Sequence, residues 1–341
     1  MNEPVRLLAL GAVSWIRTQA LYHALAELMT EDTPDTIILT RPREPYLCVG
    51  YHQPLDAVLD RAACHAAGLP IVRRRVGGGT TYLDENQQFY QCIFHHKRLP
   101  YGVDGVYAQL LSAPVAVLRK LGLPADIRDG NEIEVDGRRI AGVGGGRIGE
   151  AVVVVGNILL DFDYEIMARV WHVPSEDFRR LAYEAMRRRI TTLWSLIPQP
   201  ASPISADEIQ ARLAEAYPFA LHRPVAAGSL TEAEEAKAAV MEVRLLSEEW
   251  LHLHAQDTDE SMRKLKISLD AFVHAEKACV NGTVIGGTFF ARNDVIEQAL
   301  LTGDLLEENR HLLENRLIEN RLIGVPLKHW REVVEQLAAN P

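Results

Sequence analysis

Three arginines and three glycines, separated by one valine, form the segment of this 341-residue sequence that is best suited to chemistry. The segment runs from Arg73 to Gly79 and is flanked on both sides by apolar, strand-like residues. Backbone N–H groups in a glycine-rich turn can approach a phosphate or carboxylate closely, because no Cβ atom stands in the way. A neighbouring arginine adds a planar, permanently charged group that suits phosphate oxygens. The pattern predicts an anion-binding turn, although glycines between strands also serve as a simple structural bend.

The elements that would position this turn alternate between helical and strand-like patterns. Apolar residues at helical spacing predict helices over 18–29 and 106–123, the second kinked by its proline. Runs of β-branched and aromatic residues predict strands over 35–41, 45–51, 88–96 and 151–160. Asp136 and Gly137 predict a hairpin turn. Interleaved strands and helices favour an α/β or α+β fold, with a mixed sheet flanked by helices.

The chain is long enough for one large domain and a smaller one. Proline, serine and glycine concentrate between residues 198 and 230, so we expect a boundary there. The prediction is a domain over 1–229 that carries the glycine turn and a smaller α+β accessory domain over 230–341. In the second domain, a helical segment precedes a small antiparallel sheet with turns at residues 281–282 and 293–294.

Composition narrows the class of protein. A formal net charge of -10 argues against a protein that coats nucleic acid. No segment approaches roughly 20 uncharged apolar residues, so we expect no membrane span. Neither the paired histidines His95 and His96 nor the others show metal-ligand spacing with a carboxylate, and we expect surface or capping roles for them. The four cysteines are scattered, without zinc-site spacing, as is typical of reduced thiols in a cytoplasmic protein: Cys48, Cys64, Cys92 and Cys279.

Five segments, taken in order, resemble the lipoate-protein ligase A family of the biotin and lipoate ligase superfamily. The resemblance covers about residues 15 to 330. The segments are EPYLCVGYHQ with its Gly50-x-x-Gln53 element, RRRVGGGTTY, NEIEVDGRRIAGVGG, VVGNILLDFD, and a C-terminal stretch that ends at Gly303 and Asp304.

The resemblance implies an enzyme that activates lipoate with ATP and magnesium to lipoyl-AMP and passes the acyl group to a lysine of a lipoyl-carrier domain. It implies that Glu132 supplies the magnesium ligand, since a carboxylate oxygen suits that ion. The acyl chain would lie in an apolar slot beside Tyr82 and Phe89. The implied acyl- and ATP-binding residues are Arg74, Arg75, Gly77, Gly78, Gly79, Tyr82, Asn131, Gly142 and Arg147.

One departure from the family concerns its reactive lysine, which lies in a Lys-Ile-x-Gly turn. This chain has Arg139 at that position, followed by Ile140, Ala141 and Gly142. Arginine keeps the positive charge, but it is wider and accepts no proton near neutral pH. Two histidines of the family are also replaced, by Leu83 and Val155. Arg139 is therefore the candidate catalytic residue of an altered site.

Three functions fit these residues. The first is a ligase in which Arg139 or Arg147 steadies the phosphates. The second is an acyltransferase that moves octanoyl or lipoyl groups between carrier proteins through a cysteine thioester; Cys92 is the cysteine nearest the turn in sequence, although its apolar strand favours a core position. The third is a non-catalytic module that binds an acyl group, an adenylate or a carrier domain. We expect a cytoplasmic monomer in each case.

Overall fold

The computed structural model describes residues 3–128, 130–197, 203–254, 263–268, 270–280, 282–303 and 318–339. The chain divides into two compact units, each discontinuous in sequence. The first contains Met1–Leu55, Arg61–Asp163 and Ile190–Asp257; the second contains Asp56–Asp60, Tyr164–Arg189 and Thr258–Pro341. The second unit therefore includes a segment from the middle of the chain.

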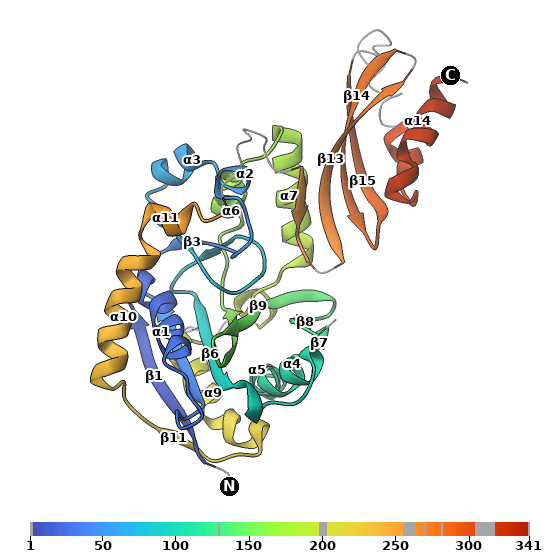
Figure 1. Ribbon diagram of the computed structural model, residues 1–341. Coiled ribbons are helices and arrows are strands. Elements are labelled where there is room, and N and C mark those ends of the chain that lie inside the picture. Colours follow the sequence, from blue (N-terminus) through green and yellow to red (C-terminus); the bar gives the residue numbers. More distant parts are fainter. Residues whose placement is uncertain are drawn as a thin grey trace. The chain divides into compact units, whose positions relative to one another are not determined.

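An eight-stranded mixed sheet forms the centre of the first unit (Figure 1). From one edge to the other its strands are β11 (Val225–Ala227), β1 (Val5–Val13), β2 (Thr36–Pro42), β6 (Gln87–His95), β10 (Ala151–Leu159), β9 (Arg138–Ile148), β8 (Glu132–Val135) and β7 (Ala125–Arg128). β1 runs parallel to β2 and β11, and the other neighbours are antiparallel. The mixed sheet predicted from the sequence is confirmed.

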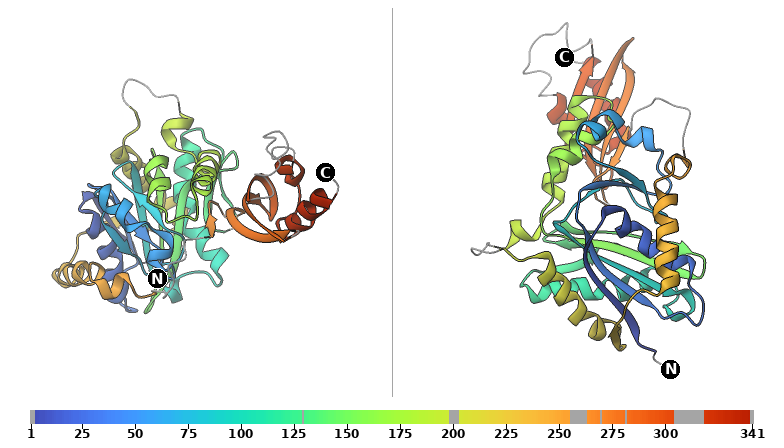
Figure 2. Two further views of the ribbon diagram at one scale, coloured as in Figure 1. Left: turned by 90° about the horizontal axis from the view of Figure 1, so that it is seen from above. Right: turned by 90° about the vertical axis from the view of Figure 1, so that its left-hand side faces the viewer.

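Helices cover both faces of this sheet. The described helices of the first unit are α1 (Trp15–Glu27), α3 (Arg61–Ala66), α4 (Val103–Leu110), α5 (Ser112–Lys120), α8 (Leu193–Leu196), α9 (Ala206–Leu221), α10 (Glu232–Leu245) and α11 (Glu248–Leu251), with the 3-10 helix η1 (His96–Arg98). One face packs against α5 and α9 in a core that contains Leu118 and Tyr217. The other packs against α1 and α10, which lie side by side (Figure 2), in a core that contains Leu25 and Met241.

Strand β6 contributes to both cores, because successive side chains of a strand point to opposite faces. Phe89 and Ile93 belong to the core beneath α1 and α10. Tyr90, Cys92 and Phe94 belong to the core beneath α5 and α9. This alternation decides which residues of the sheet can face the glycine turn.

A second, three-stranded sheet carries the glycine turn. Its strands are β4 (Ile71–Arg73), β3 (Tyr46–Val49) and β5 (Thr81–Leu83), in that order. Residues 74–80 join β4 to β5, the two edge strands. Side chains from β3 to β5, including Tyr46, Cys48 and Leu83, belong to the core that contains α1.

The second unit is built on a four-stranded antiparallel sheet. Its strands and helices are β12 (Lys264–Lys266), β13 (Ala271–Val280), β14 (Thr283–Arg292), β15 (Val295–Gly303), α6 (Tyr164–Val170), α7 (Glu176–Arg189), η2 (Leu327–His329) and α14 (Trp330–Ala339); α2 (Leu55–Val58) falls where the chain passes from one unit to the other. The predicted turn at Asn293 and Asp294 is confirmed, since both have positive φ. Asn281 and Asp304 lie outside the described residues.

The boundary predicted near residue 230 is not where the compact units divide. The proline-rich stretch that suggested it contains helix α9, whose Ile209, Leu213 and Tyr217 are buried in the first unit. Helix α10 belongs to the same unit, because it packs against α1. The proline content suggested a break in the structure, but Pro218 lies inside α9 and does not end the helix. None of the described helices is long and apolar enough to cross a membrane.

We predict that Met241→Ala lowers the free energy of unfolding of the first unit by about 2–5 kcal/mol, since it leaves a cavity between α10 and α1. Val243→Ala on the same helix is the matched control: Val243 is 73% exposed, so its replacement should change stability by less than about 0.5 kcal/mol. Urea denaturation followed by tryptophan fluorescence measures both. Equal effects of the two variants would contradict the packing of α10 on this unit.

Candidate functional site

Three glycine-containing segments meet in the first unit. The N–H of Gly77 donates to the carbonyl of Gly145 at 3.4 Å, which joins the turn to strand β9. A Cβ atom on Gly144 would lie 3.1 Å from the Gly77 oxygen, and one on Gly50 would lie 1.9 Å from the Gly78 oxygen. Gly78 itself has φ +103°, a conformation that side chains disfavour. Glycine is therefore required for these backbones to approach one another.

The Arg74 side chain lies within the glycine turn and hydrogen-bonds its backbone. Its Nε and Nη2 donate to the carbonyl of Gly77, Nη2 also donates to Gly79 at 2.7 Å, and Nη1 donates to the oxygen and sulfur of Cys48. These bonds use all five N–H groups of the guanidinium. The sequence predicted that Arg74 lines the ligand pocket; in the structure its donors are engaged by backbone oxygens and the Cys48 sulfur.

The other two arginines of the triplet are also engaged. Arg73 is fully buried and donates to the backbone oxygens of Gly50, Tyr51, Gln53 and Leu251. It fixes the Gly-x-x-Gln segment against the end of α11. None of these acceptors was predicted, because they are backbone oxygens far from residue 73 in sequence.

Arg75, also predicted to bind ligand, points toward α1 instead. Its Nη1 lies 2.7 Å from Glu27 Oε1, and Glu27 also pairs with Lys237 and Arg244. Burial raises the pKa of Glu27, but the hydrogen bond with Lys237 and the charges of the three cations outweigh it and lower the pKa. Glu27 thus ties the glycine turn to α10.

His23 supports the same turn from helix α1. Its Nε2 accepts the backbone N–H of Arg75 at 3.0 Å, so Nδ1 carries the proton and donates it to Gln19 O at 2.6 Å. Burial lowers the pKa of His23 to about 4. The neutral ring is therefore the form that holds the turn.

The candidate catalytic residue Arg139 lies beside Glu132. Their side chains approach to 3.5 Å between Nη1 and Oε1, and Glu132 is 5% exposed. The other carboxylate oxygen of Glu132, Oε2, and the side-chain oxygen Oδ1 of Asn131 are buried without a hydrogen-bond partner. Two of the residues predicted from the sequence, Glu132 and Arg139, are thus brought together as a guanidinium beside a carboxylate with one unsatisfied oxygen.

The register of the sheet directs Glu132 to the face of the glycine turn. Ile133 pairs with Ala141, which places Glu132 next to Gly142; Gly142 pairs with Asn157. Directly opposite residues on neighbouring strands share one face of a sheet. Asn157 pairs in turn with Phe89. The side chains of Phe89 and of Val76, which lies in the glycine turn, both belong to the core below α1, so this face of the sheet is the one that the turn covers. Asn157 also donates to Gln87 Oε1 at 2.5 Å.

Arg147 does not join this site. It lies eight residues beyond Arg139 on β9, roughly 26 Å along the strand at about 3.3 Å per residue. Strand alternation points it to the face opposite that of Gly142, Gly144 and Gly146. It is exposed and pairs with Glu150 at 3.6 Å. The structure thus separates Arg147 from Arg139 and Gly142, a separation that the sequence does not reveal, because it contains the glycine cluster but not the face that each residue takes.

Tyr82 and Phe89 are both buried, as an apolar lining requires. The Tyr82 ring packs edge to face on Phe162, with 6.2 Å between ring centroids. Next to Tyr82, burial raises the pKa of Asp84 to about 6, although Asp84 accepts hydrogen bonds from Asn86 and Gln87.

Cys92 lies on the far face of the sheet from the glycine turn. Its thiol is fully buried, contacts the Tyr217 hydroxyl at 3.7 Å, and has its pKa raised to about 12 by burial. Cys48, the cysteine that does touch the turn, is also buried, and burial raises its pKa. A nucleophilic thiol needs access and a lowered pKa. Cys92 is therefore a core residue.

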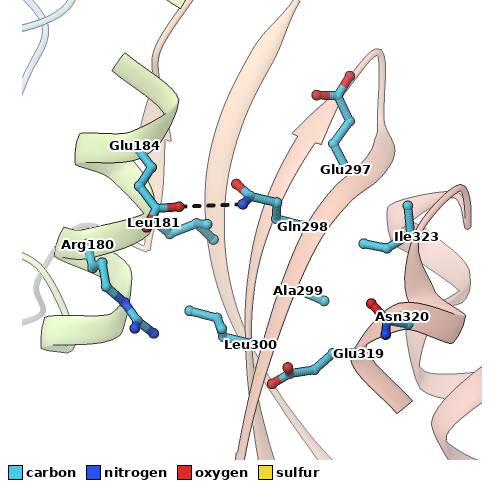
Figure 3. A pocket seen from close by; sticks show the side chains of 10 residues that line it. All are labelled: Arg180, Leu181, Glu184, Glu297, Gln298, Ala299, Leu300, Glu319, Asn320 and Ile323. Carbon is cyan, nitrogen blue, oxygen red and sulfur yellow. Dashed lines mark hydrogen bonds between the residues drawn. The ribbon is translucent and has the colours of Figure 1, made fainter. Parts of the chain in front are cut away.

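The second unit holds a cavity of 370 Å³ between α7, β15 and residues 319–323 (Figure 3). Its lining mixes charges of both signs, including Arg180, Glu297 and Glu319. Gln298 and Glu184 meet across it at 3.4 Å. None of the site residues predicted from the sequence lines this cavity.

We predict that Gly50→Ala destabilises the first unit by at least about 3 kcal/mol, because its Cβ cannot coexist with the Gly78 oxygen at 1.9 Å. Gly79→Ala is the matched control in the same region, since a Cβ there meets nothing within 4 Å. Thermal and urea denaturation of both variants test this. A Gly50→Ala protein as stable as Gly79→Ala would show that the two backbones are not in contact.

The pKa of His23 predicts a pH dependence of stability. The unfolded chain binds a proton on His23 near the ordinary value of 6.5, whereas the folded protein binds it only near 4. The contribution is therefore complete above pH 6.5 and is lost as the pH falls toward 4, by up to about 3 kcal/mol. Urea denaturation from pH 7 to 4 should give a smaller loss for His23→Gln than for the wild type, with the exposed His65→Gln as control. Parallel pH curves for all three proteins would refute the assignment.

Comparison with known proteins places these features in a family. Residues 16–218 match the family model of the lipoyl protein ligase A/B catalytic domain. The octanoyltransferase LipM of Symbiobacterium thermophilum is 25% identical over 232 residues, which cover 62% of this chain and 83% of that protein. This identity leaves the choice between ligase and transferase open.

Solved structures share the fold. The bi-partite lipoate protein ligase of Thermoplasma acidophilum, from a study that includes its E2 lipoyl domain, gives a TM-score of 0.66 at 22% identity and covers 76% of this chain and 99% of its own. A lipoate-protein ligase A bound with ATP gives 0.62 at 21% identity, with coverage of 74% and 100%. The family match spans more than half of the chain and includes both the glycine turn and Arg139. The chain therefore belongs to the lipoyl protein ligase A/B catalytic-domain family.

Proposed function

We propose that this protein is an ATP-dependent ligase that activates lipoate, or a similar medium-chain acid, as an acyl-adenylate and transfers the acyl group to a lysine of a lipoyl-carrier domain. The observation that carries the proposal is the pair of Glu132 and Arg139 on the face of the sheet that bears the glycine turn, with a second oxygen of Glu132 buried and unsatisfied. A guanidinium next to a carboxylate is suited to phosphates and their counter-ion.

The cysteines support a ligase over a thioester transferase. Cys48, Cys64 and Cys92 are buried, and burial raises the pKa of Cys48 and Cys92. Cys279, the exposed cysteine, belongs to the second unit, whereas Arg139 belongs to the first. An acyl-adenylate route needs no thiol, because the carrier amine attacks the activated acyl group directly.

In this route the acid's carboxylate oxygen attacks the α-phosphorus of ATP, the bond to the bridging oxygen breaks, and pyrophosphate leaves. The carrier amine then attacks the acyl carbon and AMP leaves. Arg139 would stabilise the negative charge that grows on the phosphate oxygens. Because arginine cannot accept the proton of the attacking amine near neutral pH, another group must take it.

Glu132 Oε2 fits a magnesium ion, since it is a buried oxygen atom without a hydrogen-bond partner and oxygen is the ligand that this ion requires. Asn131, the preceding residue, also has a buried side-chain oxygen without a partner and is proposed as a further ligand. Magnesium bound there would supply further positive charge against the phosphates. The other carboxylate oxygen of Glu132, Oε1, lies 3.5 Å from Arg139 Nη1. The same carboxylate would therefore orient the guanidinium and bind the ion.

The glycine turn would hold the adenylate end of the acyl group through backbone N–H groups. Of the three turn glycines, Gly79 has open space where a Cβ would lie, whereas Gly77 and Gly78 pack against β9 and Arg74. The arginines of the triplet would act by shaping this turn. Tyr82 and Phe89 would contact the acyl chain.

The test is ATP–pyrophosphate exchange by the purified protein with magnesium, offering lipoate, octanoate and biotin separately. We predict exchange with one acid and a loss of about 100-fold or more in Arg139→Met and Glu132→Gln. Arg139→Lys should keep or raise the rate, because lysine retains the charge. Arg138→Met is the matched control, as it removes the neighbouring guanidinium on the same strand.

A folded protein that exchanges pyrophosphate with none of the acids would contradict the ligase proposal. Transfer of octanoate from a carrier protein to a lipoyl domain without ATP would then identify a transferase, the activity named for the Symbiobacterium relative. Binding of a lipoyl domain without either reaction would identify a non-catalytic module.

A further inference from the structure

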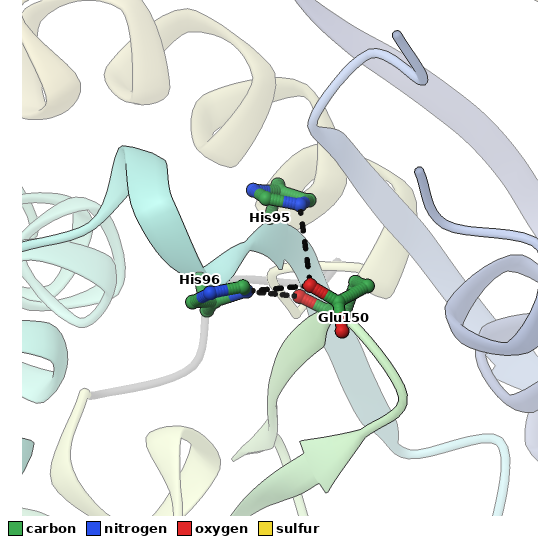
Figure 4. A group of neighbouring side chains, drawn as sticks. All are labelled: His95, His96 and Glu150. Atoms are coloured by element: carbon green, nitrogen blue, oxygen red, sulfur yellow. Dashed lines mark hydrogen bonds and ion pairs between the residues drawn. The ribbon is translucent and has the colours of Figure 1, made fainter. Parts of the chain in front are cut away.

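Two consecutive histidines and one glutamate form a cluster at the edge of the first unit's sheet where β6 ends and β9 turns into β10 (Figure 4). His95 ends β6 and His96 begins η1, while Glu150 lies in the turn between β9 and β10. His96 Nδ1 lies 3.3 Å from Glu150 Oε2, and His95 Nε2 lies 3.7 Å from the same oxygen. One nitrogen of each histidine and one carboxylate oxygen all lie within 4.8 Å of one another.

His95 is the unusual member of the cluster. Its side chain is 1% exposed, and its Nε2 has no hydrogen-bond partner although it points toward Glu150. An unsatisfied buried nitrogen costs free energy unless a donor, an acceptor or an ion completes it. His96 and Glu150 are more exposed, so the cluster is open to solvent on one side.

The spacing of these atoms matches a metal site. Zinc binds histidine nitrogen and carboxylate oxygen at about 2.0–2.2 Å, so neighbouring ligand atoms in a tetrahedron are about 3.3–3.5 Å apart. The two measured separations from Glu150 Oε2 are 3.3 and 3.7 Å. We propose that His95 Nε2, His96 Nδ1 and the Glu150 carboxylate bind one zinc ion, with solvent in the remaining position.

Metal binding must displace three existing contacts. His96 Nδ1 donates to the backbone oxygen of Glu150 at 3.2 Å; coordination through Nδ1 moves the ring proton to Nε2 and breaks that bond, at a cost of about 1 kcal/mol. Arg147 Nη2 lies 3.6 Å from Glu150 Oε1, an exposed ion pair that is worth at most about 1 kcal/mol. His95 Nδ1 accepts the N–H of Lys97 at 3.3 Å. Coordination through Nε2 moves the ring proton to Nδ1 and breaks that bond, at a cost of about 1 kcal/mol. The three costs together are small beside the binding free energies of structural zinc sites.

The ion would act as a structural link and not in acyl transfer. Glu150 is eleven residues from Arg139 along the β9 hairpin, and β9 spans roughly 30 Å between them at about 3.3 Å per residue. Zinc would fasten the β9–β10 turn to the end of β6. The inference does not depend on the proposed ligase activity, because no residue of the cluster belongs to that site.

The test is titration of the metal-stripped, full-length protein with ZnCl2 by calorimetry, and with Co²⁺ by visible absorption. We expect one ion per chain, a Co²⁺ spectrum of tetrahedral intensity, and a rise in Tm on adding zinc, since an ion that binds only the folded state stabilises it. His96→Ala and Glu150→Gln should weaken binding at least about 100-fold, as loss of an outer-shell partner alone costs 10–100-fold. Both positions are partly exposed, so these variants should fold.

The matched control is His329→Ala, which removes an exposed histidine 3.1 Å from Glu332 without a second histidine beside it. Cys279→Ser removes the exposed thiol as a competing ligand. Both should bind zinc as the wild type does. No stoichiometric binding by the wild type, or equal losses in His96→Ala and His329→Ala, would overturn the proposal; pyrophosphate exchange is expected to be unchanged in all four variants.

Discussion

The candidate site depends on one interaction, the clamp that Arg74 makes on the backbone of the glycine turn. Its guanidinium gathers the carbonyls of Gly77, Gly79 and Cys48, so the carbonyl oxygens of the turn face inward. With these oxygens satisfied, the turn can lie against β9, where glycines leave room for it. A buried cation is costly unless its donors are all paired, and here they are. The arginine triplet thus mainly stabilises the conformation of the turn.

The supports of this turn come from distant parts of the chain. Arg73 reaches the end of α11, and Arg75 reaches Glu27, which is shared with Lys237 of α10. Helix α10 therefore belongs with the sheet because it helps to position the turn as well as to cover α1. This explains why a proline-rich stretch before it does not mark a boundary between the units.

Replacing the family lysine by Arg139 changes what this site can do. A guanidinium paired with Glu132 at 3.5 Å keeps a fixed positive charge near the unsatisfied oxygen of that carboxylate. It can stabilise phosphate charge, but it cannot take a proton from an incoming amine near neutral pH. A site of this kind places more of the electrostatic stabilisation on arginine and on any bound ion, and it leaves proton removal to other groups.

The sequence by itself determined the class of fold, the main helices and strands, the Asp136–Gly137 hairpin and the family. Each of these depends on local periodicity, on turn residues or on the order of motifs, which are properties of the sequence alone. It also identified Glu132, Arg139 and Gly142, which the structure brings together. Only the tertiary structure decided that Arg74 and Arg75 serve the protein interior, that Arg147 lies on the opposite face, and that Glu150 meets His95 and His96. These outcomes depend on strand register and on backbone acceptors far away in sequence, and neither leaves a local pattern.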